Sequence, residues 1–553
     1  MKSFLFRIVC VFVCVLVSVG ITPIQPVNAT TYTVNTLMDE ADGSCADGDC
    51  SLRDALALAE NGDTIDFSVT GTITMSLGQF EIADNVIING PGPDDLTIDA
   101  TLGSRVFYVW TNKNPTIRGL TIVNGAVYGN SGAGVFILDG GLTIEDCVFS
   151  FNRALNGGNG GGIYASRSNV TIINSTFSNN LANYSGDVTG SGNGGGVYNW
   201  QGNTTISDSI FEENWGGAGG GGGGVYVNGA DSSKALIITN STFEENWTGS
   251  GNGGGVYSGG SGGTEIRRSS FISNATDGNG GGVFHSGSLL YLINDTLDSN
   301  RATHSGGGLY NSSGANVMFS TFFLNTSETS VGGIYSTASF SVMSSIIASS
   351  NGGNCGGVPM EGYSTGFSTD ATCAPLTVKT APQINLGDLS GNPAYYPLLA
   401  DSHAIDADTS GMCVDAYYGT DIDQRGMTRP LDGDGDGTAT CDMGSFEREE
   451  VTRITIDSDS PEPSVTGQAV SVSVTVEAAT GTASGTVDIS GADTNCSITL
   501  DDTASGSCDV TFTSSGSKTL TATYNGDTIH LGSTDTEAHT VNKAETTITI
   551  GDA

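Results

Sequence analysis

Hydrophobic residues along most of this chain occur in short β-branched runs separated by glycine, asparagine and serine. The runs at 170–173 and 235–238 are typical, and both end at polar turn residues, as strands do. Neither they nor their neighbours have the i, i+3, i+4 spacing over ten or more residues that an amphipathic helix needs. The pattern therefore predicts an all-β chain built from short strands.

A phrase of glycines followed by an apolar residue and an aromatic ring returns throughout the middle of the chain. Its aromatic position falls at Tyr164, Tyr198, Tyr226, Tyr257, Phe284, Tyr310 and Tyr335. The spacing shortens from 34 residues (164 to 198) to 25 (310 to 335), which is the length of one supersecondary unit. Coils of two or three short strands, stacked about 4.8 Å apart, make a parallel β-helix. We expect about eight coils and a rod on the order of 40 Å long.

Equivalent residues of successive coils stack into ladders along such a rod. An apolar interior ladder is expected at Phe149, Phe177, Phe211, Phe243, Phe271, Leu297, Phe322 and Ile346. A ladder of small residues is expected at Cys147, Ser175, Ser209, Ser241, Ser269 and Ser320. A turn ladder is expected at Asn152, Asn180, Asn214, Asn246, Asn274, Asn300 and Asn325, since asparagine tolerates left-handed backbone and its amide both donates and accepts. The aromatic row is either a further stacking ladder, the commoner arrangement, or a platform for sugar rings.

The first 29 residues have the pattern of a secretory signal peptide. Lys2 and Arg7 precede an apolar stretch at 8–20, and Ala29 ends a small-residue cleavage site. The apolar stretch is too short to cross a bilayer, and no later segment is apolar enough. We expect a secreted, extracellular and cell-surface-associated protein with no membrane span beyond the signal peptide.

Residues 30–110 are expected to form an N-terminal cap and the first coils. Strands are predicted at 32–34, 63–67 and 86–90. Between them, residues 50–62 predict a helix in which Ser51 and Asp54 form a capping box and Gly62 ends the helix. An amphipathic helix here would cover the open end of the solenoid.

Nine cysteines remain after the expected cleavage, and eight of them lie in local pairs. Proximity in an exported chain favours the disulfides Cys45–Cys50, Cys355–Cys373, Cys413–Cys441 and Cys496–Cys508, although spacing alone does not determine connectivity. Cys147 occupies the small-residue ladder and is expected to be a buried free thiol.

The chain carries 59 acidic and 19 basic residues, a formal charge of −40. This balance argues against nucleic acid and anionic membranes as partners and favours solubility and divalent cations.

Several motifs resemble a known family. Residues 50–55 (Cys-Ser-Leu-Arg-Asp-Ala) and 117–122 (Ile-Arg-Gly-Leu-Thr-Ile) resemble segments of bacterial right-handed parallel β-helix surface proteins of the pectate-lyase-like fold. Residues 404–407, 423–426 and 441–447 resemble the region that closes such helices in choice-of-anchor Q proteins. The resemblance implies a right-handed β-helix over 111–350 and a closing region over 351–447.

Beyond residue 447 threonine, serine and valine alternate, most strictly at 470–476. The segment 448–543 resembles a bacterial Ig-like β-sandwich domain. Its opening residues 452–456 recur at 546–550, so residues 544–553 are expected to begin a second, truncated Ig-like repeat.

Two coils repeat Phe-Glu-Glu-Asn-Trp, which would place Glu213, Glu245, Trp215 and Trp247 on one patch. Paired carboxylates between aromatic walls occur in glycoside hydrolases, but a solvated acidic turn has the same composition. We expect binding of a sugar or a cation here rather than catalysis.

Asp432, Asp434, Asp436 and Gly437 reproduce the first half of an EF-hand calcium loop. Position twelve is Met443 rather than glutamate, so a true EF-hand is not predicted. Calcium is the expected ion, and an acidic glycine-rich loop without an ion is the alternative. Asp421, Asp423 and Asp442 are further candidate ligands.

The catalytic motifs of known enzymes with the pectate-lyase-like fold are missing from this sequence, which argues against catalysis. The Gly-His-Gly and Arg-Ile-Lys motifs of polygalacturonases are absent, and the five histidines are scattered. Pectate lyases set a basic residue over calcium-binding aspartates, and this rod has few basic residues. We expect a non-catalytic stalk or adhesin with a possible carbohydrate or cell-surface partner. A polysaccharide lyase or glycoside hydrolase acting in the rod's groove is the alternative, and a passive spacer is a third reading.

Overall fold

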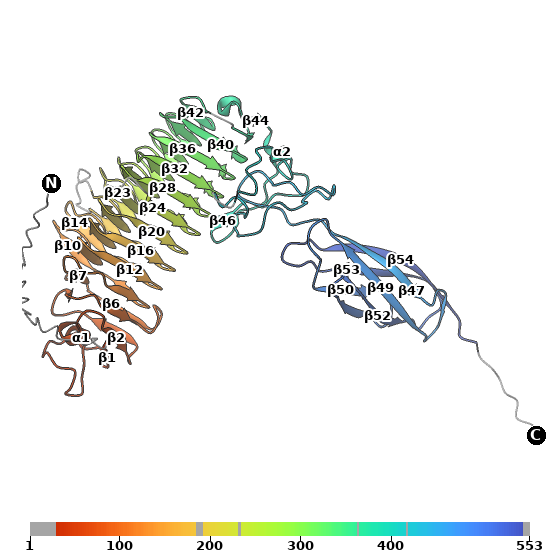
Figure 1. Ribbon diagram of the computed structural model, residues 1–553, viewed down its shortest axis with the longest axis horizontal. Coiled ribbons are helices and arrows are strands. Elements are labelled where there is room, and N and C mark those ends of the chain that lie inside the picture. The colour runs from red at the N-terminus through yellow and green to blue at the C-terminus, as the bar shows by residue number, and fades with distance from the viewer. Residues whose placement is uncertain (1–28, 184–191, 231–233, 362–363, 416–417, 546–553) are drawn as a thin grey trace, which may run out of the picture.

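The computed structural model describes residues 29–183, 192–230, 234–361, 364–415 and 418–545. The expected signal peptide (1–29, apart from Ala29) and the start of a second Ig-like repeat (546–553) lie outside these residues. The chain forms a parallel β-helical rod, an irregular closing region and a β-sandwich, in that order (Figure 1). The predicted all-β fold class is confirmed.

Four parallel sheets make up the rod, and we name them sheets A to D. Sheet A has twelve strands from β1 (Thr31–Val34) to β40 (Phe340–Met343), and sheet B has thirteen from β3 (Gly71–Thr74) to β44 (Thr377–Val378). Sheet C has eleven, from β4 (Phe80–Ile82) to β42 (Cys355–Gly357), and sheet D eight, from β10 (Ala126–Tyr128) to β38 (Thr326–Ser327). The rod is longer than the predicted eight coils because its first coils lack the glycine phrase.

A middle coil uses one strand from each sheet rather than the two or three predicted. One example runs through β12 (Gly141–Glu145) in sheet A, β13 (Val148–Ser150) in sheet B, β14 (Arg153–Leu155) in sheet D and β15 (Ile163–Ser166) in sheet C. The extra strand is short because the chain turns sharply on either side of it.

The phenylalanine ladder fills the interior on sheet B. Phe149 and Phe177 are fully buried and stack at 4.8 Å, with ring planes 5° apart. At the far end the prediction is wrong by one residue, because Phe322 pairs with Ile347. Ile346 instead points outward and packs against the closing region.

The small-residue ladder is continuous and includes two members that were not predicted, Asp295 and, after Ser320, Ser345. The backbone N–H of each member donates to the side chain of the next, as Ser241 does to Ser269 at 3.1 Å. Asp295 takes the place between Ser269 and Ser320, where it is fully buried. Cys147 begins the ladder as a buried free thiol.

The asparagine ladder is buried as predicted, but its backbone role differs. The left-handed residue of each turn is the one before the asparagine, for example Phe151, Glu213 and Glu245 at φ 56°, 51° and 52°. The asparagine itself points inward and stabilises the turn through its side-chain amide.

Helix α1 (Leu52–Leu58) covers the first coils. Ser51 caps it by accepting a hydrogen bond from the N–H of Asp54. The helix is shorter than the predicted 50–62, because Ala59 already has extended backbone, so Gly62 does not end it. Leu52, Ala55 and Leu56 are buried in the main core.

The closing region predicted at 351–447 does more than cover the end of the rod. β42, β43 (Gly366–Ser368) and β44 continue the coils, and Leu376 packs on the end of the core. Residues 385–415 and 418–447 then run back along the outer face of sheet B, where Asn392 accepts a hydrogen bond from Thr242 and Tyr396 donates one to Asp298. The segment therefore closes the flank of several coils rather than the end alone.

The C-terminal sandwich packs two layers whose strands are antiparallel, except that β48 runs parallel to β54. One layer is β47 (Arg453–Ser460), β49 (Ala469–Glu477) and β52 (Ser505–Thr511). The other is β48 (Ser464–Val465), β54 (Ser533–Asn542), β53 (Gly516–Tyr524), β50 (Thr486–Ser490) and β51 (Cys496–Thr499). Between closing region and sandwich, Glu450 is fully buried and its carboxylate accepts the N–H of Thr480 at 2.7 Å.

The structure joins the four predicted cysteine pairs as disulfides. Across the described segments of the chain, no helix has the length and apolar character needed to span a membrane.

Candidate functional site

The two predicted tryptophans lie side by side on sheet D. Trp215 in β22 (Trp215–Gly216) pairs with Trp247 in β26 (Trp247–Thr248), and their ring centroids are 4.9 Å apart. Both side chains are half-buried. Glu213 and Glu245 are exposed at the turn that precedes each tryptophan. The structure thus brings the four predicted residues to one corner of the rod, over two neighbouring coils.

A surface hollow of about 560 Å³ begins at this corner and extends toward the N-terminal coils. Glu213 and Trp215 line it, while Trp247 and Glu245 lie one coil beyond it. Its other lining residues include Tyr128, Phe151, Arg153, Leu155 and Leu181. Tyr128 and Phe151 are 70% and 45% exposed.

Sequence reasoning missed these additional lining residues, although the repeat contains the signal. Phe151 and Glu213 occupy the same left-handed turn position, one residue before the ladder asparagine. Arg153, Leu181 and Trp215 occupy the same strand position, one residue after it. Aligning the two positions that flank each ladder asparagine would have predicted that their side chains form neighbouring columns on the outside of the rod.

The first glutamate of each Phe-Glu-Glu-Asn-Trp phrase, Glu212 or Glu244, lies on the outer face of sheet B. Glu212 pairs with Glu244, and partial burial raises the pKa of Glu212, with the charges of Glu213 and Glu244 adding to the shift. The patch is therefore strongly anionic and suits a cation or a hydroxyl-rich ligand better than an anion.

The aromatic row is a stacking ladder along sheet C. Tyr226 and Tyr257 stack at 4.4 Å, and Tyr108 and Phe136 extend the row toward the N-terminus. Burial raises the pKa of Tyr226 to about 12. The rings cover one another, so this row offers edges rather than open ring faces.

The predicted calcium loop forms a different carboxylate group from the one expected. Oxygens of Asp406, Asp432 and Asp434 lie within 4.8 Å of one another, while Asp436 is outside the group and accepts the N–H of Thr438. Asp432 is buried and accepts the backbone N–H groups of its own loop, including that of Gly437 at 2.9 Å. Three carboxylates remain arranged so that a hard cation can bind between them.

Asp406 reaches the loop from a distant part of the closing region. Its Oδ2 accepts the N–H of Asp434 at 2.9 Å. Burial raises its pKa to about 6, and the charges of Asp434 and Asp432 contribute to the shift. A cation at this position would relieve that repulsion.

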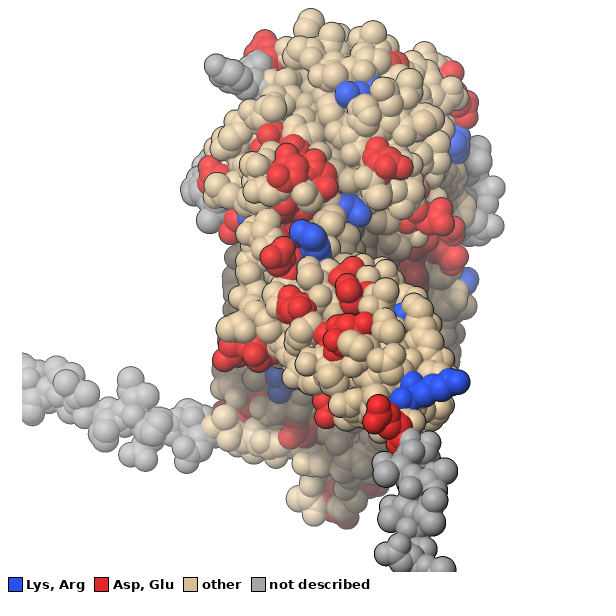
Figure 2. All heavy atoms as spheres, turned by 90° about the vertical axis from the view of Figure 1, so that its right-hand side faces the viewer, with Lys and Arg blue, Asp and Glu red and all other residues tan. Residues whose placement is uncertain are grey.

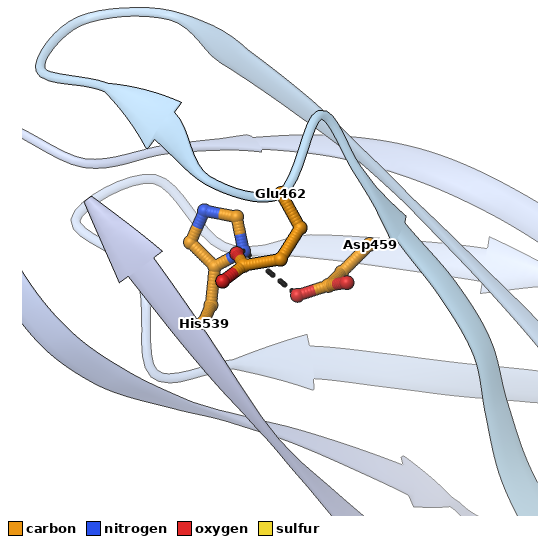
Figure 3. A group of neighbouring side chains, drawn as sticks. All are labelled: Asp459, Glu462 and His539. Carbon is orange, nitrogen blue, oxygen red and sulfur yellow. Dashed lines mark hydrogen bonds and ion pairs between the residues drawn. The ribbon is translucent and has the colours of Figure 1, made fainter. Parts of the chain in front are cut away.

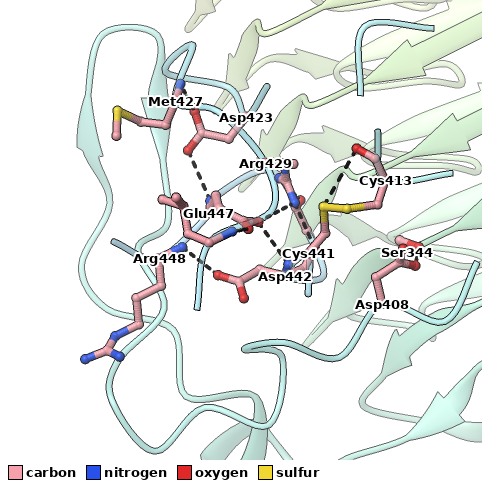
Figure 4. A network of polar contacts seen from close by, with 12 residues as sticks. Ser344, Asp408, Cys413, Asp423, Met427, Arg429, Cys441, Asp442, Glu447 and Arg448 are labelled. Atoms are coloured by element: carbon pink, nitrogen blue, oxygen red, sulfur yellow. Dashed lines mark hydrogen bonds and ion pairs between the residues drawn. A yellow bond between two sulfur atoms is a disulfide. The ribbon is translucent and has the colours of Figure 1, made fainter. Parts of the chain in front are cut away.

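Asp442 and Asp423, two of the further candidate ligands, take part in a structural network (Figure 4). Arg429, almost fully buried, forms an ion pair with Glu447 at 3.0 Å and donates to the carbonyl oxygen of Asp442. Burial raises the pKa of both Asp442 and Glu447. Asp423 accepts the N–H of Glu447 at 3.1 Å.

This network explains why the motifs of the closing region occur together. The guanidinium of Arg429 also lies 4.8 Å from the ring centroid of Phe319, on the rod. The disulfide Cys413–Cys441 and the hydrogen bond from Ser344 to Asp408 fasten the same segment. The titratable groups here hold the closing region to the rod.

Acidic side chains are spread over the face that the C-terminal sandwich presents, with few lysines and arginines among them (Figure 2). This distribution agrees with the formal charge of −40. It gives that face a negative potential, which disfavours contact with polyanions.

Comparisons with known proteins identify two parts of the chain. Residues 105–297 match the model of the right-handed β-helix region, and residues 457–542 match that of the bacterial Ig-like domain, group 3. No curated protein and no solved structure matches the chain. With the structure, these matches identify a right-handed parallel β-helix followed by a bacterial Ig-like domain.

Proposed function

We propose that this is an exported, non-catalytic surface protein, a stalk that presents a glycan-binding face. The observation that carries the proposal is the hollow beside Trp215 on sheet D. Exposed rings of Tyr128 and Phe151 stand next to Arg153 and Glu213. Aromatic faces beside hydrogen-bonding charged groups are the usual means by which proteins hold sugar rings.

The position of the perturbed acids supports a structural rather than a catalytic role. Glu447, Asp442 and Asp295 are buried and accept backbone N–H groups, so their shifted pKa values belong to structural contacts. In the hollow itself, Glu213 is exposed to water. A general acid is normally tuned by burial or by a paired carboxylate.

The proposed location follows from disulfides and sequence. Four disulfides suit an oxidising compartment, and the N-terminal sequence suits export. We place the closing region with the choice-of-anchor Q type on the strength of its interlocking motifs. Calcium at Asp406, Asp432 and Asp434 would stiffen that region, and we expect no nucleic acid partner.

A lyase or hydrolase remains the second candidate because of another hollow on the rod. It measures about 670 Å³ at the corner between sheets A and B, and Arg118, Glu145 and Asp146 line it. Arg118 donates to the side chain of Asn89 at 2.7 Å. A basic residue beside acids in an open groove is compatible with proton abstraction from an acidic sugar.

The test is incubation of the full chain with a panel of polysaccharides, with and without calcium. Both retention and new reducing or unsaturated ends are scored. We expect retention without product, and at least a tenfold loss of retention in Trp215→Ala and Tyr128→Ala. Trp200→Ala is the matched control, because Trp200 is 38% exposed on sheet C, away from the hollow. Product formation would favour the second candidate, and equal retention by all variants would refute the proposed site.

A further inference from the structure

In the Ig-like domain, two carboxylates face the same ring nitrogen of one histidine (Figure 3). His539 Nδ1 lies 2.7 Å from Asp459 Oδ2 and 2.7 Å from Glu462 Oε2. His539 is fully buried and stacks on Phe512 at 5.0 Å. Asp459 lies near the end of β47, Glu462 lies in the following turn and His539 lies on β54, so two segments far apart in the sequence bring the donor atoms together.

Hydrogen bonding alone accounts poorly for this arrangement. A ring nitrogen carries at most one hydrogen, so Nδ1 cannot point a full N–H bond at both oxygens. Two carboxylates facing one imidazolium also leave an excess negative charge in a nearly buried place. Lys518 lies opposite His539 on β53, but its ammonium donates to Ser514.

The surroundings orient the three donors as a metal site would. His539 Nε2 lies 2.7 Å from the hydroxyl of Ser464, so an Nε2–H donated to Ser464 leaves the Nδ1 lone pair facing the carboxylates. Glu462 is fixed in turn, because both of its oxygens accept the N–H of Thr540 at 2.9–3.0 Å.

We propose that His539, Asp459 and Glu462 bind a divalent transition metal ion, for which zinc is the natural probe. One imidazole and two carboxylates suit such an ion better than calcium, which prefers oxygen ligands alone. A zinc ion about 2.0–2.2 Å from each donor would hold the donors about 3.4 Å apart, so each would move outward by less than about 1 Å. The side chain of Glu462 is 37% exposed, which provides an entry path for the ion and a position for a water ligand.

The site would link the two layers of the sandwich. Asp459 belongs to the three-stranded layer and His539 to the five-stranded one. The disulfide Cys496–Cys508 joins the same two layers at their opposite edges, between β51 and β52. Asp459 and Cys508 lie in one cross-strand row, because both pair with Val472. The metal ion and the disulfide would therefore cross-link the two layers at opposite edges of the sandwich.

The test uses the full chain, stripped with a chelator and then titrated with zinc by calorimetry. Asp459→Asn and Glu462→Gln keep an oxygen that can accept from Nδ1–H, so both variants are expected to fold, which circular dichroism checks. Asp527→Asn is the matched control: His530 Nδ1 contacts two oxygens of the single carboxylate of Asp527, at 2.8 and 2.9 Å. The double variant Asp406→Asn/Asp434→Asn removes two of the three carboxylates grouped in the closing region, while the exposed group Asp42, Asp47 and Asp49 stays as a background common to all variants.

We expect this double variant to bind zinc in the Ig-like domain and to lose at least tenfold in affinity there with either Asp459→Asn or Glu462→Gln, but not with Asp527→Asn. Zinc at tenfold over its dissociation constant should raise the Ig-like melting transition by roughly 6–11 °C. Cobalt(II) in its place should show the visible absorption of a four-coordinate site. Zinc binding unchanged by either carboxylate variant, or no zinc retained at all, would overturn the proposal and leave an ion pair.

Discussion

The side-chain amide of Asn246 donates to the amide oxygen of Asn274, one coil further along the rod, at 2.9 Å. The same amide group donates to the carbonyl oxygen of Phe211 at 2.8 Å, and its oxygen accepts the N–H of Asn214 at 3.1 Å. Every polar atom of this fully buried side chain is thus engaged. The link repeats along the asparagine ladder and ties the turns of successive coils together.

Asn246→Ala is expected to destabilise the rod by about 3 kcal/mol, because it leaves several buried polar groups without partners. Chemical unfolding of the full chain, followed on the rod's transition, measures the effect. Asn240→Gly is the control: Asn240 also bonds between coils, to Asp208 at 2.6 Å, but near the surface, and glycine tolerates its left-handed backbone at φ 50°. Its loss should cost less than about 1 kcal/mol. Equal costs at the two positions would contradict the buried ladder as the source of stability.

Asp295 should make the rod more stable in mild acid than at neutral pH. Complete burial raises the pKa of this carboxyl well above its usual value, so the folded state binds the proton more tightly than the unfolded state. The free energy of unfolding should therefore rise as the pH falls through the raised pKa. Asp295→Ser, which restores the residue found elsewhere in the ladder, should remove this contribution. Unfolding curves at several pH values for both proteins test it, and identical pH profiles would contradict it.

His285 should have the opposite effect on stability, lowering the free energy of unfolding as the pH falls. Burial inside the rod lowers its pKa from 6.5 to about 4, so between these values the unfolded state takes up a proton that the folded state does not. Stability should fall as the pH drops from 6.5 to 4, by about 3 kcal/mol over the whole window.

His285→Asn should remove that loss, since Asn311 and Asn199 occupy the same inward column. His304→Asn is the control, because His304 is exposed. If both variants keep the acid sensitivity of the parent, the buried imidazole is not its cause.

Calcium should raise the melting temperature of the closing region, through Asp406, Asp432 and Asp434. Thermal unfolding in calcium and in a chelator should differ by several degrees in the parent protein and not in Asp434→Asn or Asp406→Asn. Asp436→Asn should keep the response, because Asp436 lies outside the group. A chelator without effect on the parent would refute a calcium site here.

Sequence reasoning predicted the ladders because each coil repeats the same local pattern. It missed Asp295, since the repeat there has aspartate in place of serine. It misplaced Ile346 because two isoleucines are adjacent there, and the second, Ile347, pairs with Phe322. The hollow was predicted only in part. Glu213 and Trp215 were recognised as a phrase, whereas Phe151 and Arg153 share their positions without sharing their residue types.

The sequence by itself determined the all-β fold, the stacking of coils and the interior rows. These depend on contacts between equivalent positions about one coil apart, which a repeat displays directly. Only the tertiary structure decided which groups from distant segments meet. Asp406 reaches the loop of Asp432 across the closing region, and His539 meets Asp459 across 80 residues. Such contacts arise from the packing of unlike segments, for which the chain carries no local periodic signal.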